Sequence, residues 1–345
     1  MKSLDTMTLL TVFLVFLRGL NKAATALPQP KHRSNEHHHS FQKLYSASIA
    51  PGVQTNFAYW CGPTLGGYCG SMSFDDINLQ AVTHVAFAFA TISAQGVVSY
   101  TYDQGDVQNY NSSQLIQQNI MPGLSLGGSG TPAHYCLDNI DTCVATLGKT
   151  LEYYESVGSP FHFVDSDFEQ PQNTEQMQRL ITFWLTFNAQ FPGYLITMAP
   201  ECAYLWCGEA PWPYNAYVPV MNQLGPYGKD ILYKVNAQAY NNWCSYAPAG
   251  TEEFFNAVAT TWITACPATG YLGLEKNPNL FGLGVLAANE DGDGYAPPAI
   301  VTAALVAIGE QYSTNRNGMF WNTKTDAENN YVISKAMAAA APAPF

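Results

Sequence analysis

The sequence predicts a single-domain (β/α)8 barrel, because apolar strand-like segments alternate with helical patterns along about 285 residues. Eight strand segments are present, which is the number that closes this fold, and several of them end in polar side chains. A doubly wound open sheet is the alternative. The segment around Gly128 and Gly130 is too loose a match to a phosphate-binding glycine loop, and we find no internal repeat and no second domain.

The strands are recognised as short apolar runs that are rich in β-branched and aromatic residues. In chain order they are NFAYW at 56–60, THVAFAFA at 83–90, IMPGLSL at 120–126, FHFVDSDFE at 161–169, YLITMA at 194–199, LYKVNAQAY at 232–240, LFGLGVLA at 280–287 and NGMFWN at 317–322. Helical patterns lie between several of them, at 139–157, 174–191, 252–264 and 297–312. In the first two, apolar residues recur every three or four positions, as on one face of a helix.

The chain begins with a segment that is typical of secretion. Residues 7–17 form a short apolar run, and Ala24 and Ala26 frame a small-residue cleavage site. The run is too short to span a bilayer comfortably. We therefore divide the chain into a signal peptide at 1–26, a flexible His-rich leader at 27–52, the barrel at 53–338 and a low-complexity tail, expected to fray, at 339–345.

Composition narrows the possible partners. The formal net charge is −12 and charged residues make up only 12% of the chain, so a positive patch for nucleic acid or an anionic membrane is not expected. The 21 Tyr and 7 Trp residues offer flat apolar faces with polar edges, which suit sugar rings. We expect a secreted monomer without a cofactor or metal. The histidines at 37–39 are expected to be solvated, and the acidic stretch at 290–294 to be a turn rather than a calcium loop.

The cysteines fit an oxidising compartment. Their number is even, which in a secreted chain indicates disulfides, and zinc is the alternative. Pairing between sequence neighbours is one of many connectivities that eight cysteines allow. The close pairs are Cys61 with Cys69, Cys136 with Cys143, Cys202 with Cys207, and Cys244 with Cys266. Asn111 begins an N-glycosylation sequon.

Three acids alternate along the strand-like segment at 161–169. Asp165, Asp167 and Glu169 stand at every second position, so in a strand they share one face. Inside a barrel the three carboxylates would repel one another and lose hydration, which raises the pKa of at least one of them. An acid catalyst benefits from such crowding, whereas a structural protein does not. An exposed loop with scattered acids is the alternative.

At these residues the sequence resembles the family 18 glycoside hydrolases, the chitinase family. Asp165, Asp167 and Glu169 match the last three acids of the family motif D-x-x-D-x-D-x-E. Further matches follow in order along nearly the whole mature chain. They are the aromatic Tyr59 on the first strand, S-x-G-G at 125–128, YLITMAPE ending at Glu201, Q-x-Y-N from Gln238 to Asn241, and Trp321 on the last strand.

The resemblance implies retaining hydrolysis that is assisted by the substrate's own N-acetyl group. Glu169 would be the general acid, with its pKa raised by its neighbours. Asp167 would orient the acetamido group, and its spacing of roughly 6.6 Å from Glu169 along a strand leaves room for the sugar. Asp165 would share a proton with Asp167, and Tyr240 would hydrogen-bond the acetamido carbonyl. The residues implied to line the substrate site are Tyr59, Glu201, Gln238, Asn241 and Trp321.

Three residues depart from the family pattern. His162 stands in place of the first acid of the motif, Phe163 in place of the usual glycine, and Ser166 in place of an apolar residue. A charged His162 would lower the pKa of Glu169 and weaken it as an acid. Two functions therefore remain open, which are a secreted hydrolase of chitin or its oligomers and a weakened barrel that binds and sequesters chitin oligomers. An enzyme that acts on N-glycans is a lesser alternative.

Overall fold

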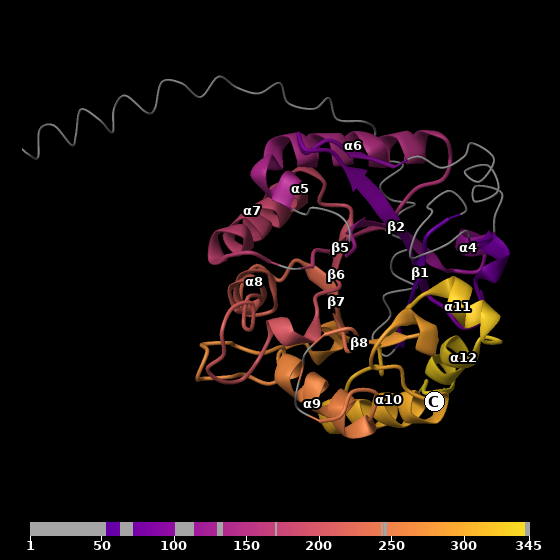
Figure 1. Ribbon diagram of the computed structural model, residues 1–345. Coiled ribbons are helices and arrows are strands. Elements are labelled where there is room, and N and C mark those ends of the chain that lie inside the picture. The colour runs from indigo at the N-terminus through magenta and orange to yellow at the C-terminus, as the bar shows by residue number, and fades with distance from the viewer. Residues whose placement is uncertain are drawn as a thin grey trace, which may run out of the picture. The chain divides into compact units, whose positions relative to one another are not determined.

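The computed structural model describes residues 53–62, 72–100, 114–129, 134–169, 171–242, 244 and 247–341. The predicted signal peptide and leader, Cys69 and Asn111 lie outside these residues, so they stay predictions. Figure 1 shows the helices arranged around a central ring of strands. No helix in the described ranges is long and apolar enough to cross a membrane.

Among the described residues, eight parallel strands close into a barrel, which confirms the predicted fold class. Each strand pairs with the next, and β1 pairs with both β2 and β9, so the open-sheet alternative is wrong. The barrel strands are β1 (Asn56–Trp60), β2 (His84–Ile92), β4 (Met121–Gly127), β5 (Phe163–Asp167), β6 (Leu195–Met198), β7 (Leu232–Gln238), β8 (Phe281–Leu286) and β9 (Gly318–Trp321). A short β3 (Val98–Ser99) extends β2 in antiparallel fashion.

The four predicted helices form within about two residues of their expected bounds, as α6 (Ile140–Ser156), α7 (Thr174–Gln190), α9 (Glu252–Ile263) and α10 (Pro298–Tyr312). Asn173 caps α7 and Thr251 caps α9, because each side chain accepts from a free backbone N–H of the first turn. The sequence patterns missed the shorter helices α4 (Gln114–Gln117), α5 (His134–Asp138), α8 (Val218–Leu224), α11 (Thr323–Glu328) and α12 (Val332–Ala339).

The C-terminal tail is more ordered than its composition indicates. Residues 336–339 form the last turn of α12, and Met337 and Ala340 are buried. Alanine has the highest helix propensity, so a run of alanines continues the helix as readily as it forms a loose tail. Residues 342–345 lie outside the described part of the chain.

Two of the three disulfides in the described part differ from neighbour pairing. Cys136–Cys143 forms as that pairing has it, whereas Cys202 bonds to Cys244 and Cys207 bonds to Cys266. The physical reason is the barrel: the loops that follow the neighbouring strands β6 and β7 meet at the same end, so Cys202 and Cys244, 42 residues apart, become spatial neighbours. Cys266 follows α9 and bonds to Cys207, 59 residues earlier in the chain. The neighbour pairings Cys202 with Cys207 and Cys244 with Cys266 are therefore wrong.

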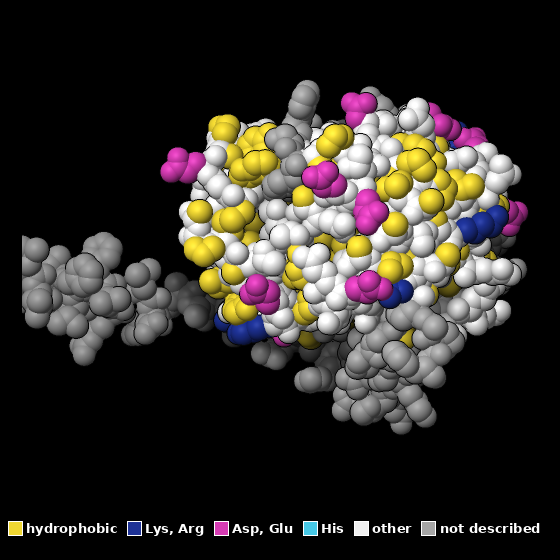
Figure 2. All heavy atoms as spheres, turned by 90° about the horizontal axis from the view of Figure 1, so that it is seen from below, with side chains coloured by type: hydrophobic (Ala, Val, Ile, Leu, Met, Phe, Trp, Pro, Cys, Tyr) yellow, Lys and Arg dark blue, Asp and Glu magenta, His cyan; other side chains and the backbone are white. Residues whose placement is uncertain are grey.

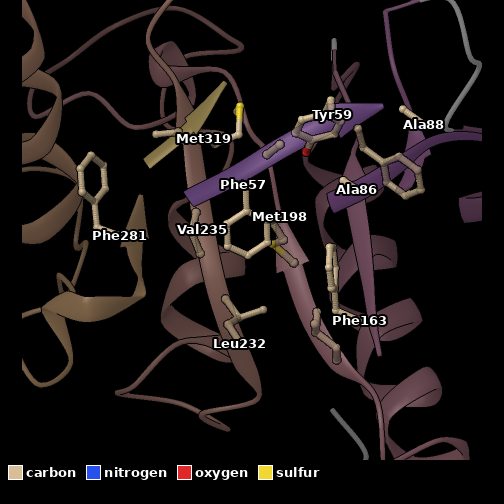
Figure 3. Close-up of a cluster of buried hydrophobic side chains, with 14 of the residues drawn as sticks. Phe57, Tyr59, Ala86, Ala88, Phe163, Met198, Leu232, Val235, Phe281 and Met319 are labelled. Carbon is tan, nitrogen blue, oxygen red and sulfur yellow. The ribbon is translucent and has the colours of Figure 1, made fainter. Parts of the chain in front are cut away.

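The barrel interior is filled largely by apolar side chains, with buried polar ones such as His84 among them. Phe57, Phe163 and Met319 are among the buried side chains that Figure 3 draws. Acidic side chains lie scattered over the outer face in Figure 2, with few Lys or Arg between them. This surface agrees with the acidic composition, since that face presents no broad positive patch.

One buried cation lies at the start of β7. Lys234 is buried on the strand, and its ammonium donates to the carbonyl oxygen of Asn279. Burial lowers the pKa of Lys234 to about 7. The fold must therefore hold a charged ammonium away from water at acidic pH.

We expect Lys234→Met to stabilise the fold at pH 6 and to remove part of its pH dependence. The folded pKa lies below the unfolded one, so the unfolded chain binds more protons between about pH 7 and 10.5, and stability rises with pH across that window. Asn279 O keeps a second donor, Asn317 Nδ2, in the variant. Thermal melts of the wild type and the variant from pH 6 to 10 measure the effect.

The matched control is the exposed Lys229 in the preceding loop. Lys229→Met should leave the slope of melting temperature against pH unchanged. Equal slopes in the wild type and in Lys234→Met would contradict a buried, titrating Lys234.

Candidate active site

Asp165 is the most deeply held of the three acids. Its side chain is on β5 inside the barrel and is 1% exposed. Tyr59 and Ser125 each donate to Oδ2 at 2.7 Å, and Thr197 donates to Oδ1 at 2.6 Å. Burial raises the pKa of Asp165, and the bonds from Thr197, Ser125 and Tyr59 lower it part of the way. Both oxygens are thus engaged by hydroxyl groups from three other strands.

Asp167 lies two residues further along β5, on the same face. Gln238 Nε2 donates to its Oδ1 at 2.6 Å. Burial raises its pKa well above the usual value, and the charges of Glu169, Asp165 and Glu201 raise it further. Asp167 therefore holds a proton much more readily than an exposed aspartate does.

Glu169 follows the end of β5 and is half-buried. Burial, followed by the charge of Glu201, raises its pKa to about 7, whereas a contact of 3.4 Å from Gln238 Nε2 opposes this shift. Glu201 lies beyond the end of β6, where its backbone bridges to Gln238, and burial raises its pKa as well. A substantial fraction of Glu169 is therefore protonated at neutral pH, as a general acid requires.

The strand ends that flank the acids carry aromatic rings. Trp321 lies 5.7 Å from Tyr59 and stacks on Phe89 at 5.8 Å between ring centroids. The sequence analysis missed Phe89, although its place near the end of the second strand could have indicated it. Gly128 leaves room for this ring, because a Cβ there would lie 2.6 Å from it. Tyr59 and Trp321 are thus brought together, as the resemblance implies.

Tyr240 is buried near the acids. Burial and then the charges of Asp167 and Glu169 raise the pKa of its hydroxyl well above the usual value. The hydroxyl contacts Met319 Sδ at 3.9 Å. Since thioether sulfur is a weak acceptor, the hydroxyl is available to a better one.

An acidic turn after β8 ties the neighbouring strand ends together. Asn241 Nδ2 donates to Asp291 O at 3.2 Å, and Asp293 N donates to Asn241 Oδ1 at 2.7 Å. The carboxylate of Asp291 accepts from Asn322 Nδ2 at 3.2 Å and from Thr325 Oγ1 at 2.7 Å. Asn241, implied to line the site, thus has its amide engaged by this turn. The sequence analysis missed Asp291 as a site residue because its partners lie on other loops.

Phe163 is accommodated by the neighbouring strand. Its ring packs inside the barrel beside Phe57, 5.5 Å away between centroids, and faces Gly123 on β4. A Cβ on Gly123 would lie 2.3 Å from the ring. The family pattern has a glycine at position 163, whereas here Gly123 on the adjacent strand makes room for the Phe163 ring. Asp165 and Asp167 therefore keep their common face.

The other two departures lie on the helix side of β5. His162 precedes the strand and is buried, and burial lowers its pKa to about 4, so the imidazole is neutral at ordinary pH. It is not among the charges that shift the pKa of Glu169. Ser166 is fully buried, and its hydroxyl has no hydrogen-bond partner among the described residues. In the described part of the structure, His162 is therefore not a positive charge next to the acids.

Comparison with known proteins shows the fold. No family model and no curated protein matches the sequence. Among solved structures, a family 18 chitinase from Chromobacterium violaceum is similar with a TM-score of 0.69 and 21% identity, covering 83% of each chain. A Rhizomucor miehei chitinase gives 0.57 and 12% over 83% of this chain and 100% of that one. A class V chitinase from Nicotiana tobaccum gives 0.56 and 12% over 85% and 100%, and a variant of it was solved in complex with NAG4.

We expect Phe163→Gly to destabilise the protein by about 3–5 kcal/mol, because removing the ring leaves a cavity that the barrel cannot close. Gly123→Ala should also destabilise, through overlap with the ring. In the Phe163→Ala background the cost of Gly123→Ala should shrink, and a double-mutant cycle by urea unfolding measures this. If Phe163→Ala and Gly123→Ala changed the free energy of unfolding additively, the packing of Phe163 against Gly123 would be contradicted.

We expect Asp291→Asn to weaken binding of a chitin hexamer, the ligand that the resemblance implies, by about tenfold. An amide nitrogen in place of Oδ2 cannot accept from Thr325, so the turn loosens and Trp321 loses support through Asn322. Fluorescence titration measures the affinity. Asp293→Asn is the matched control, since that exposed side chain lies in the same turn. Equal affinities of the two variants would refute the role of Asp291.

Proposed function

We propose that this chain, which has the fold of the family 18 chitinases, hydrolyses β-1,4 bonds of N-acetylglucosamine oligomers, with Glu169 as the general acid. The observation that carries the proposal is the state of Glu169, a half-buried carboxyl whose pKa is raised to about 7 and which shares Gln238 Nε2 with Asp167, two residues earlier at the end of β5. A polymer of N-acetylglucosamine supplies the acetamido group that the substrate-assisted route needs.

The reaction proceeds by two displacements. Glu169 gives its proton to the glycosidic oxygen while the acetamido carbonyl oxygen of the same sugar attacks the anomeric carbon, so the leaving sugar departs as an alcohol. Asp167 faces the acetamido N–H and orients it, and Tyr240 donates to the acetamido carbonyl before attack. Water then adds to the anomeric carbon and loses a proton to the Glu169 carboxylate, which restores the acid and retains the configuration.

Charge explains why the acids favour the transition state. Within the described ranges, the pKa values of Asp165, Asp167 and Glu169 are shifted by burial, by hydrogen-bond donors and by other acids, with no Lys or Arg among the groups responsible. The positive charge that develops on the sugar and its acetamido group is therefore the missing counter-charge of the site. A preorganised cluster of this kind stabilises the cationic transition state more than the neutral substrate.

Two observations favour a hydrolase over a protein that only sequesters chitin oligomers. The neutral His162 leaves the pKa of Glu169 high, and Gly123 lets Phe163 enter the barrel without displacing the acids. The aromatic pair of Tyr59 and Trp321 would serve either function, because sugar rings stack on aromatic faces in both.

The protein is proposed to work outside the cell. The three disulfides among the described residues support an oxidising compartment. The predicted signal peptide at 1–26 supplies the route, and a soluble oligomer of chitin is the expected substrate.

We expect the purified protein to convert a soluble chitin hexamer to shorter products at pH 5.5, and Glu169→Gln to lose activity by a factor of about 100 or more. Glu169 must be protonated to act, and its pKa is raised to about 7, so the rate should fall as pH rises through 7 and be much lower at pH 8.5. Mass spectrometry of the products measures both effects.

A binding titration with the same hexamer controls for folding, because Glu169→Gln keeps the size of the side chain and should still bind. Tight binding by both proteins without products would replace the hydrolase by a chitin trap. Products from both proteins at equal rates would refute Glu169 as the acid, and a comparison with an N-glycan substrate would then identify the competing activity.

A further inference from the structure

One side-chain amide lies between the two acids at the end of β5. Gln238 Nε2 donates to Asp167 Oδ1 at 2.6 Å and to the carbonyl oxygen of Ala199 at 2.7 Å. A third acceptor, Glu169 Oε1, lies 3.4 Å from the same nitrogen. Since all three neighbours accept hydrogen bonds, the nitrogen of the amide and not its oxygen must face them.

The number of hydrogens limits what this amide can do. A primary amide carries two N–H bonds, so Gln238 cannot serve three acceptors at once. The Ala199 oxygen belongs to the backbone after β6 and always accepts, which uses one hydrogen. One hydrogen is left for two carboxyl groups, and in this structure Asp167 has the shorter contact. In the described part of the chain, the amide is the only side-chain donor to either carboxyl.

The backbone of Gln238 is held on both sides. The residue ends β7 and is 4% exposed. Its backbone N–H donates to Pro200 O at 2.8 Å, and its carbonyl oxygen accepts from Asn242 Nδ2 at 2.9 Å. The amide is therefore kept beside the acids, and a small rotation is sufficient to change which carboxyl receives the second hydrogen.

We propose that Gln238 is a positioning residue that gives its second N–H to Asp167 while Glu169 holds its proton, and to Glu169 once that proton has left. In the proposed function, on which this inference rests, the proton leaves for the glycosidic oxygen. A carboxylate then forms in place of a neutral carboxyl, and hydrogen bonds to ionised groups are roughly twice as strong. The shift shortens the 3.4 Å contact and stabilises Glu169 as it becomes an anion.

The substrate replaces the donor that Asp167 loses. In the proposed function Asp167 faces the acetamido N–H, so it keeps a donor when the amide turns towards Glu169. No covalent bond changes in this step, because one N–H only exchanges its acceptor. The role of Gln238 thus differs from that of a residue that lines the substrate site, since it acts through the two acids.

Other titratable groups face this pair from the neighbouring elements. They are Asp165 on β5, Glu201 after β6, Tyr59 on β1, Tyr240 after β7 and Tyr217 before α8. Burial raises the pKa of each of the three tyrosines, so their hydroxyls stay neutral between pH 5 and 9. The oxygens of Asp165 accept from hydroxyl groups instead of from the amide. A response of the amide in this pH range therefore comes from the acids around it.

The first test follows the Gln238 side-chain amide by 1H–15N NMR in the purified protein from pH 5 to 9, without substrate. Gln238→Met removes the two amide resonances and thereby assigns them. We expect one amide proton to shift with a midpoint near the pKa of Glu169, which is about 7. The other proton, bonded to Ala199 O, should not shift. In Glu169→Gln the shift near pH 7 should be lost, because that side chain does not titrate.

The second test measures kcat/KM for a chitin hexamer against pH. Gln238→Met keeps the length of the side chain but has no N–H, and loss of this donor raises the pKa values of both Asp167 and Glu169. The alkaline limb of the profile should therefore move up by about one pH unit, and kcat at the optimum should fall by about tenfold.

The matched control is Asn236→Ala, two residues earlier on β7. It also removes a buried amide, but one that has no hydrogen-bond partner among the described residues. This variant should leave the midpoint of the alkaline limb unchanged. Thermal melts of both variants identify any general loss of folding.

The outcomes separate this inference from the proposed function. Amide protons of Gln238 that do not respond to pH, or a response near pH 7 that persists in Glu169→Gln, would overturn the inference and leave the hydrolase intact. An alkaline limb that is unchanged in Gln238→Met, or displaced equally in Asn236→Ala, would overturn it too. A wild type that binds the hexamer without cleaving it refutes the proposed function alone, because the amide titration needs no turnover.

Discussion

Three hydroxyl groups around one buried carboxylate are the constraint on which the site depends. Tyr59, Ser125 and Thr197 come from β1, β4 and β6, and all three donate to Asp165. A carboxylate in a barrel interior is costly unless its oxygens accept hydrogen bonds, so these donors make the ionised form tolerable. A charge held there then discourages ionisation of Asp167, which in turn lies between Asp165 and Glu169. The ionised form of Asp165 is thus stabilised by hydrogen bonds, whereas Asp167 and Glu169 have raised pKa values and hold their protons more readily.

No buried cation in the described part of the chain cancels this arrangement. Lys234 is buried on β7, but its ammonium donates to Asn279 O and is absent from the charges that shift the pKa values of the acids. If such a cation contacted the acids, it would lower the pKa of Glu169 and leave the site without a proton to give. His162 does not lower the pKa of Glu169 either, since burial keeps its ring neutral. Positive charge in the described part of the chain is therefore kept away from the three acids.

The sequence predicts what depends on local periodicity and misses what depends on contacts between distant strands. Alternation of Asp165, Asp167 and Glu169 follows from the two-residue repeat of a strand, and the longer helices follow from their apolar spacing. The sequence alone does not show that Gly123 makes room for the ring of Phe163, because the two residues meet only after β4 and β5 pair. The same holds for Cys202–Cys244 and Cys207–Cys266, whose partners lie 42 and 59 residues apart in the chain and meet only in the folded barrel.

The loops that follow β6, β7, β8 and β9 are linked to one another at the carboxyl ends of these strands. Cys202–Cys244 links the loops after β6 and β7, Asn241 links β7 to the turn at Asp291, and Asp291 links that turn to Asn322 after β9. Each link holds one of these loops in a fixed position relative to the next. Preorganisation of this kind is what electrostatic catalysis requires, because groups that are already in place need not reorganise as charge develops.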